Sequence, residues 1–232
     1  MKAARLSDCL HCQMRGESIF AGLDPVELCT LGMEVQDLDC APGEVLYRTG
    51  DPARYAYTLR EGAVKLVKPL RSGQEVILRL LHHGDLFGFE GMQEELHRHD
   101  AISLTQGKVC RLDLIELQVL SERLPKIREA IFRRWQEALR DSEERVVELG
   151  AKKAEARLAT FLLQWASRYP QLRSLPFPLT RQDLAAFLGL SVEHVSRLMA
   201  EFKRQGLLQE SRNQLEILAS GRLEDIAAAK PD

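Results

Sequence analysis

The chain has 232 residues, of which 45% are hydrophobic and 28% are charged, and its formal net charge at pH 7 is −2. This length allows one large domain or two small ones, and the near-neutral charge excludes a uniformly basic nucleic-acid coat. No apolar run approaches the roughly 20 residues that cross a membrane. We therefore expect a cytoplasmic protein without a membrane partner, whose five cysteines are reduced thiols or metal ligands rather than disulfides.

A Cys-x-x-Cys motif lies in the short polar segment formed by residues 1–18. Basic residues precede Cys9 but no apolar stretch does, so we expect no signal peptide. The spacing of Cys9 and Cys12 allows both thiolates to bind one metal ion or one corner of an iron–sulfur cluster. Gln13 follows Cys12 where a c-type haem motif requires His, which argues against covalent haem attachment. A pair of unligated thiols is the alternative.

A helical entry is predicted within residues 20–38, because apolar residues recur there at helical spacing. Cys29 and Cys40 have apolar neighbours and are most simply buried core thiols. The apolar residues of the entry are Phe20, Leu23, Val26, Leu28 and Leu31.

Short strands are predicted throughout residues 39–112, because glycines recur between segments rich in Val, Leu, Ile and Tyr. The sequences EGAVK (61–65) and RSGQE (71–75) are typical of hairpin turns. Many short strands with glycine turns indicate an antiparallel roll or barrel. Period-two alternation predicts that one face of these strands consists of Tyr57, Leu59, Val64, Leu66, Val76, Leu78 and Leu80.

One long helix is predicted over residues 122–150, because neither Gly nor Pro occurs between Lys126 and Leu149. Positions three and four residues apart form a heptad seam between charged flanks, which predicts a two-stranded coiled coil and therefore a homodimer. A helix packed against its own roll is the alternative. The seam consists of Phe132, Trp135, Leu139, Ser142, Val146 and Leu149.

Residues 180–208 carry the most specific signal, that of two helices joined by a glycine turn. Thr180 can cap the first helix with Asp183 as its capping-box partner, Gly189 ends that helix, and Ser191 can cap the second. Residues 207–218 are expected to form a hairpin that turns at 211–213, as in the wing of a DNA-binding domain. The second helix is expected to bury Val195, Leu198, Met199 and Phe202.

The opposite face of this second helix presents side chains suited to base edges. Glu193 can accept a hydrogen bond from cytosine N4, and Arg197 can donate two to guanine O6 and N7. Val192 and Ser196 can meet a thymine methyl group or a phosphate. We therefore expect a helix-turn-helix that binds double-stranded DNA, rather than an ordinary helical hairpin with a solvated outer face.

This V-E-x-x-S-R pattern resembles the helix-turn-helix of the CRP/FNR family of bacterial transcription regulators, and within it the FNR branch. The segments PGEVLYRTGD (42–51), LREGAVKLVK (59–68) and LLHHGDLFGF (80–89) resemble the cyclic-nucleotide-binding-like roll of the same family. The resemblance covers about residues 20–226. It implies an α+β fold with an N-terminal antiparallel β-roll, a long dimerisation helix and a C-terminal winged helix-turn-helix. The expected divisions are 1–120, 121–150 and 151–232.

The same resemblance implies a dimeric regulator, and not an enzyme, that binds a TTGAT-like inverted repeat and has RNA polymerase as a partner. Thr180, Arg181 and Gln182 match the T-R-Q start of the family's first helix, which contacts phosphate. His194 departs from the small hydroxylated residue expected at its position among the DNA-facing residues. Cyclic AMP is not expected as the ligand, because His99 and Asp100 stand where nucleotide-binding members carry Arg-Ser to hold the cyclic phosphate. Arg98 is one position off, and Asp100 would repel the anion.

Members of the FNR branch hold an oxygen-labile [4Fe–4S] cluster through closely spaced N-terminal cysteines and one cysteine at the position of Cys110. Cys9, Cys12 and Cys110 match that layout, but the family pattern would place a further cysteine at Ser18. Cys29 is the nearest substitute for the fourth ligand. A non-cysteine ligand such as His11, and a chain without a cluster, are the alternatives.

Two other functions stay open at this stage. The first is a cluster-free member of the family that senses nitric oxide through haem in the roll, or another small molecule. The second is a cupin-type metalloenzyme with an appended domain, for which the His-x-His motif at His97 and His99 provides metal ligands.

Overall fold

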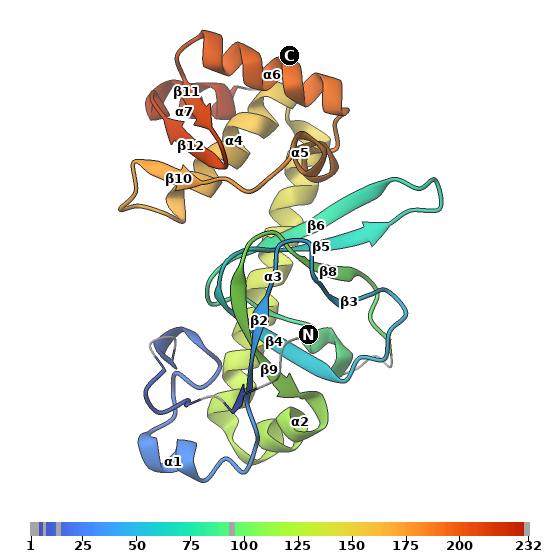
Figure 1. Cartoon of the computed structure of the whole chain (residues 1–232), viewed down its shortest axis with the longest axis vertical. Helices are drawn as coiled ribbons and strands as arrows, with labels where there is room; N and C mark the ends of the chain where they lie inside the picture. Colours follow the sequence, from blue (N-terminus) through green and yellow to red (C-terminus); the bar gives the residue numbers. More distant parts are fainter. Residues whose placement is uncertain (1–4, 7, 13–14, 93–95, 230–232) are drawn as a thin grey trace. The chain divides into compact units, whose positions relative to one another are not determined.

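The computed structural model describes the whole chain except residues 1–4, 7, 13–14, 93–95 and 230–232 (Figure 1). The chain divides into two compact units, residues 1–139 and residues 140–232. Among the described residues, no helix combines the length and the apolar character needed to span a lipid bilayer.

Two antiparallel sheets form the roll of the first unit, as the glycine-punctuated strand pattern predicts (Figure 1). The first sheet has the order β1–β2–β9–β4–β7, with bounds Arg5–Leu6, Gln36–Cys40, Gly107–Asp113, Tyr55–Glu61 and Leu86–Phe87. The second has the order β3–β8–β5–β6, with bounds Val45–Tyr47, Asp100–Ser103, Val64–Pro69 and Glu75–Leu81.

Two details of the predicted strands are wrong. The sequence EGAVK forms a turn at Gly62, but β4 and β5 belong to different sheets, so this turn connects the sheets and is not a hairpin. Leu78 is 40% exposed and does not face the core, whereas Ile77 and Leu81 do. A bulge is the reason: Leu66 pairs with Arg79 and the next residue pairs with Ile77, so Leu78 is skipped.

The predicted helical entry is also shorter than its apolar spacing indicates. Its helix, α1, spans only Pro25–Cys29; Asp24 caps its start, and Gly32, with a φ of 67°, prevents its extension. Val26 is 73% exposed, whereas the other apolar residues of the entry are buried. Two 3-10 turns, Arg15–Glu17 (η1) and Phe89–Met92 (η2), and one further helix, Leu114–Arg123 (α2), complete the unit apart from its long helix.

The first unit has two hydrophobic clusters. One fills the roll between the sheets and includes Tyr47, Leu59 and Phe87. The other joins the outer face of the first sheet to α2 and the start of the long helix, and it includes Ile19 and Phe20. The N-terminal segment is therefore fixed to the unit by buried apolar side chains, which also places Cys9 beside this second cluster.

The long helix, α3, spans Pro125–Ala151 and starts three residues later than predicted, because Leu124 is extended and separates it from α2. Ile127, Ala130 and Ile131 are buried in the first unit. The predicted seam lies on the other side and is exposed in the single chain. Its five apolar members are exposed by 57% (Phe132), 37% (Trp135), 60% (Leu139), 71% (Val146) and 40% (Leu149).

The second unit is a winged helix-turn-helix around buried aromatic and leucine side chains. The indole of Trp165 is 1% exposed, packs beside Phe161 and Phe177, and donates to the carbonyl of Pro176 at 2.8 Å. A three-stranded sheet, β10–β12–β11, contains the predicted wing hairpin. The elements are α4 (Ala154–Ser167), β10 (Ser174–Pro176), α5 (Arg181–Leu188), α6 (Val192–Arg204), β11 (Leu208–Ser211), β12 (Gln214–Ile217) and α7 (Ser220–Ala228).

Gly189, in the turn between α5 and α6, supports a stability prediction. Its φ is 63°, and an added Cβ would lie 3.3 Å from Leu149 Cδ2. Gly189→Ala should therefore destabilise the protein by ~1–3 kcal/mol, measured by urea unfolding. Gly221→Ala is the control, because Gly221 lies in α7 with no atom within 4 Å of the added Cβ. Equal stability of the two variants would contradict the strain at Gly189.

Candidate nucleic-acid interface and cysteine site

The second helix of the pair, α6, separates its two faces as the sequence predicts. Val195, Met199 and Phe202 are at most 2% exposed. Leu198 is half-buried. On the opposite face Val192, Glu193, Ser196 and Arg197 are all exposed, and His194 beside them is half-buried. A buried face fixes the helix on the unit, and its polar face is left free for a partner.

Local capping sets the start of each helix in this pair. The Thr180 hydroxyl accepts from the Asp183 backbone N–H at 3.0 Å, and an Asp183 carboxylate oxygen accepts from the Thr180 backbone N–H at 2.9 Å. At the start of α6 the Ser191 hydroxyl accepts from the His194 backbone N–H at 3.2 Å. These bonds satisfy otherwise unpaired N–H groups and fix where the exposed residues of α6 begin.

Glu193 and Arg197 lie near each other on the exposed face. Hydrogen bonds from its own backbone N–H and from the Ser191 hydroxyl lower the pKa of Glu193, and the charge of Arg197 lowers it further. Glu193 is therefore an ionised acceptor at neutral pH. Ser196 is already engaged within the helix, because its hydroxyl donates to the Val192 carbonyl at 2.8 Å.

Arg181 has an internal partner that the sequence did not indicate. Its guanidinium binds both carboxylate oxygens of Glu210 on β11, with 3.0 Å between Nη1 and Oε1. The two side chains are 31% and 28% exposed. A phosphate must therefore compete with the Glu210 carboxylate for Arg181. Thr180 and Gln182, on either side of Arg181 in the sequence, are exposed.

Two arginines bind the carbonyl groups at the end of α5. Arg157 donates to the Leu188 carbonyl at 2.9 Å. Arg145 of α3 donates to the Phe187 carbonyl, and its guanidinium carbon lies 3.4 Å from the centre of the Phe187 ring. Burial lowers the pKa of Arg145 to about 10. Cations favour the C-terminal end of a helix, so Arg145 holds the helix pair on the end of α3 and Arg157 holds it on α4.

Three of the five cysteines, Cys9, Cys12 and Cys110, lie near one ion pair. Cys110 lies on β9 directly opposite Asp37 of β2, and its Sγ is 3.5 Å from Asp37 Oδ1. Arg60 of β4 donates to the other Asp37 oxygen, Oδ2, at 2.7 Å. Both Cys12 and Cys110 lie close enough to Arg60 to affect its ionisation. Sequence spacing did not reveal this pair, because strand register brings Asp37 and Arg60 together.

The ionisation of these groups reflects their shared surroundings. Burial raises the pKa of the Cys9 thiol, and the nearby Cys12 and Asp37 raise it further. Burial alone would lower the pKa of Arg60, but the hydrogen bond to Asp37 and the nearby thiols raise it overall. The Arg60 Nε–H is buried and has no hydrogen-bond partner among the described residues. It remains available to an anionic group among the thiols.

The other two cysteines differ from each other. Cys40 is 1% exposed, which confirms that it is a core thiol, and burial raises its pKa to about 11. Cys29 is exposed at the end of α1, so its expected burial is wrong. Within the described residues, none of the contacts around Asp37 and Arg60 reaches Cys29, nor do they include His11, which pairs with Asp8 at 2.7 Å.

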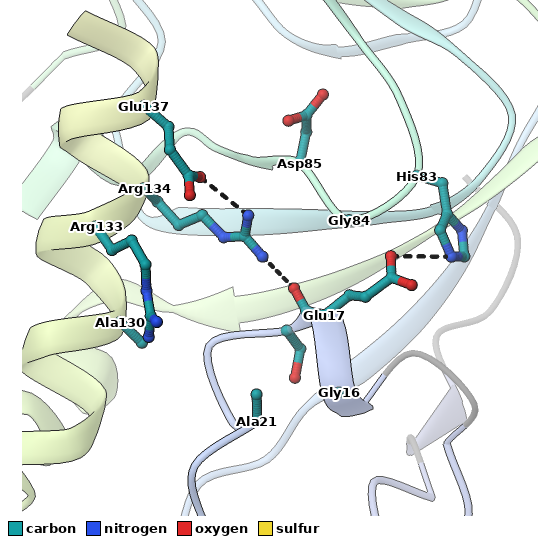
Figure 2. A pocket seen from close by; sticks show the side chains of 11 residues that line it. Gly16, Glu17, Ala21, His83, Gly84, Asp85, Ala130, Arg133, Arg134 and Glu137 are labelled. Carbon is teal, nitrogen blue, oxygen red and sulfur yellow. Dashed lines mark hydrogen bonds and ion pairs between the residues drawn. The ribbon is translucent and has the colours of Figure 1, made fainter. Parts of the chain in front are cut away.

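A pocket of about 340 Å³ lies where the N-terminal segment meets α3. Figure 2 shows Glu17 between Arg134 of α3 and His83 of the β6–β7 loop. Arg134 donates to the Glu17 carbonyl, and the Glu17 carboxylate lies 3.5 Å from His83 Nε2. Arg134 also pairs with Glu137 at 3.0 Å. The segment that carries Cys9 and Cys12 is thus bound to α3 by polar contacts as well as by the apolar cluster.

The His-x-His motif lies in a polar group inside the roll. Glu90 Oε1 is 3.5 Å from His97 Nδ1 and 3.4 Å from His99 Nε2, and the Tyr47 hydroxyl is 3.0 Å from His99 Nε2. The His97 ring stacks on Tyr47 with 3.7 Å between ring centres. Across the described residues, no three or more His, Cys, Asp and Glu side chains are placed to hold a metal ion as they stand.

Two protein-family models match the chain. A cyclic nucleotide-binding domain matches residues 38–123, and a Crp-like helix-turn-helix domain matches residues 156–226. The first match covers most of the roll, and the second runs from α4 through most of α7.

Curated relatives and solved structures agree with these matches. The fumarate and nitrate reduction regulatory protein of Vibrio cholerae is 31% identical over 82% of this chain and 78% of its own length. The transcriptional activator protein FnrA of Stutzerimonas stutzeri is 28% identical over 95% of this chain and 92% of its own. The structure of FixK2 from Bradyrhizobium japonicum is 28% identical, with a TM-score of 0.79, and covers 85% of this chain and 99% of FixK2.

Proposed function

Because this chain belongs to the CRP/FNR family of transcription regulators, we propose that it binds an inverted DNA repeat as a homodimer and senses redox state through its N-terminal cysteines. Family membership makes it a DNA-binding regulator and not an enzyme, which excludes the cupin-type alternative. The observation on which the proposal depends is the exposed pair Glu193 and Arg197 on a capped helix whose other face is buried.

Base recognition follows from the residues of the exposed face. The ionised Glu193 accepts from cytosine N4, and Arg197 donates to guanine O6 and N7. Val192 contacts a thymine methyl group, and Ser196 and His194 flank these positions on the same helix. The half-site proposed from the family resemblance is TTGAT-like.

The exposed apolar seam of α3 supports a homodimer. Five large apolar side chains in one heptad register are 37% to 71% exposed in the single chain, and a second copy of α3 would bury them further. Two recognition helices in one dimer fit half-sites about 34 Å apart, as an inverted repeat requires. We assign sensing to residues 1–120, dimerisation to 121–150 and DNA binding to 151–232. The cytoplasm and RNA polymerase are the proposed location and partner of this regulator.

The cysteine site supports a redox signal. Cys9, Cys12 and Cys110 would hold an iron–sulfur cluster, because thiolates are the usual ligands of such clusters. The unpartnered Nε–H of Arg60 also suits a cluster, since it can donate to an anionic sulfur. A bound cluster would supply a redox-active centre there. Cys29, the fourth ligand expected from the sequence, would have to leave the end of α1 to join the other three cysteines.

The N-terminal segment connects this site to α3. Arg134 holds the backbone at Glu17, and Lys126, in the first turn of α3, pairs with Glu27 at 2.9 Å. Arg134 and Lys126 both belong to α3, the helix that carries the seam. A change in the position of the N-terminal segment would therefore alter its contacts with this helix. This arrangement couples the thiol site to dimerisation.

A cluster-free regulator that senses nitric oxide through haem, or another small molecule, is the second candidate. The partly buried group of Glu90, His97 and His99 in the roll favours it, because imidazoles can ligate haem iron. Substitution of Cys9 and Cys12 separates the two candidates. If transcription in cells still responds to air after this substitution, the result would favour the cluster-free candidate.

Arg197→Ala tests the recognition face. The variant should lose ~1–3 kcal/mol of binding to its preferred operator and should no longer discriminate at one base pair, measured by fluorescence anisotropy with operator variants. Arg204→Ala is the control on the same helix, because Arg204 pairs with Glu201 and should keep the base preference. Equal weakening on all sequences would assign Arg197 to phosphate instead.

Glu210→Gln tests the internal competition for Arg181. Loss of the carboxylate should free the guanidinium for phosphate, so DNA affinity should rise and the slope of log affinity against log salt should steepen by about 0.9 per half-site. The double variant Arg181→Ala, Glu210→Gln should lose this gain. Unaltered affinity and salt slope in Glu210→Gln would show that Arg181 does not reach DNA.

Leu139→Glu tests the seam. A carboxylate in the middle of the apolar stripe should shift the protein to monomer in analytical ultracentrifugation and weaken binding to an inverted repeat by at least about tenfold. Ile115→Glu provides the control, since Ile115 is equally apolar and 76% exposed but lies on α2, outside the seam. A dimeric Leu139→Glu variant would place the interface elsewhere.

A further inference from the structure

Cys110 and Asp37 form a cross-strand pair at the centre of the cysteine site. In the antiparallel pairing of β2 with β9 they stand directly opposite each other, so their side chains are on the same face of the sheet. The Cys110 Sγ and the Asp37 Oδ1 are 3.5 Å apart. Asp37 also lies near enough to Cys9 to affect its ionisation. A carboxylate is therefore already present among the three thiols.

We infer that the carboxylate of Asp37 is the fourth ligand beside Cys9, Cys12 and Cys110, in place of a fourth cysteine. This inference rests on the proposed iron–sulfur site. It concerns one oxygen atom, Oδ1, because the other oxygen is bound by Arg60. Carboxylate oxygen is an established iron ligand in proteins, although four thiolates are the usual set for a cluster.

Arg60 orients Asp37 for this role. Its hydrogen bond to Oδ2, 2.7 Å long, fixes the carboxylate so that Oδ1 faces the thiol of Cys110. A group that hydrogen-bonds the atom of a metal ligand that does not face the metal fixes the orientation of the ligand and affects its basicity. The unpartnered Nε–H of the same guanidinium is buried nearby and gives the site one donor for sulfur. Arg60 is thus a positioning residue, and Asp37 is the ligand.

Cys29 is held away from this role by its own surroundings. The helix α1 on which it lies has a complete capping box at Asp24, and its Leu28 is buried in the apolar cluster. Glu27 of the same helix pairs with Lys126 of α3 at 2.9 Å. Moving Cys29 to the other thiols would break these contacts, whereas Asp37 already lies beside Cys110. His11 is also engaged elsewhere, since it pairs with Asp8.

An oxygen ligand has a functional consequence. Carboxylate is a harder donor than thiolate and matches the soft iron–sulfur unit less well. The position held by Asp37 is therefore the weakest of the four. Asp37 and Arg60 are 28% and 21% exposed, so small oxidants can reach this position. Replacing Asp37 by cysteine should make the site more resistant to air.

The test compares four variants of the full-length chain with the wild type, all reconstituted without oxygen with ferrous iron and sulfide. The variants are Asp37→Asn, Asp37→Cys, Cys29→Ala and Asp39→Asn, the last being an exposed carboxylate on the same strand. Iron content, sulfide content and visible absorption are measured, followed by the rate of bleaching in air. Circular dichroism and urea unfolding establish that each variant is folded.

Cys29→Ala and Asp39→Asn should load like the wild type, and Asp37→Asn should lose at least about half of its iron and sulfide. Asp37→Cys should recover full loading and bleach more slowly than the wild type. Full loading of Asp37→Asn, or loss of the cluster in Cys29→Ala, would overturn the role of Asp37 alone. If Asp37→Asn does not fold, Cys29→Ala and Asp37→Cys decide the question. Wild-type protein that takes up neither iron nor sulfide on reconstitution would overturn the proposed cluster as well as the role of Asp37.

Discussion

The helix α3 has apolar side chains on two faces, and both the packing of the first unit and the proposed dimer depend on them. Its inner face, around Ile127 and Ile131, is buried with residues of the N-terminal segment in one hydrophobic cluster. Its outer face keeps a stripe of large side chains in solvent. Burial of such a stripe gains free energy in proportion to the apolar area removed from water, which favours the homodimer proposed above. The helix continues into the second unit, where Arg145 binds the end of α5.

Short-range rules were sufficient to predict the DNA-binding unit from the sequence. Capping by Thr180 and Ser191, the left-handed Gly189 and the 3.6-residue period of α6 all involve residues within a few positions of one another. The exposed apolar stripe of α3 was predictable for the same reason. In each case local propensity and the packing of the fold agree, which is what makes a pattern reliable.

Sequence reasoning failed where distant segments meet. Strand register places Asp37 opposite Cys110 and brings Arg60 to both, yet these residues come from three strands far apart in the chain. The same holds for Glu210 and Arg181, which are 29 positions apart. The bulge at Leu78 reversed the expected alternation because one unpaired residue moves all that follow to the other face. The family pattern directed attention to cysteines, and a carboxylate partner therefore went unnoticed.

The pairing of Arg181 with Glu210 bears on how such a protein searches a chromosome. Random sequence offers only backbone charge, and a guanidinium that already has a carboxylate gains little by exchanging it for a phosphate. On the function proposed above, dissociation from random sequence would then be fast. An operator would add the proposed base contacts of α6, which would outweigh the exchange. The internal carboxylate would thus increase the difference in affinity between an operator and random sequence.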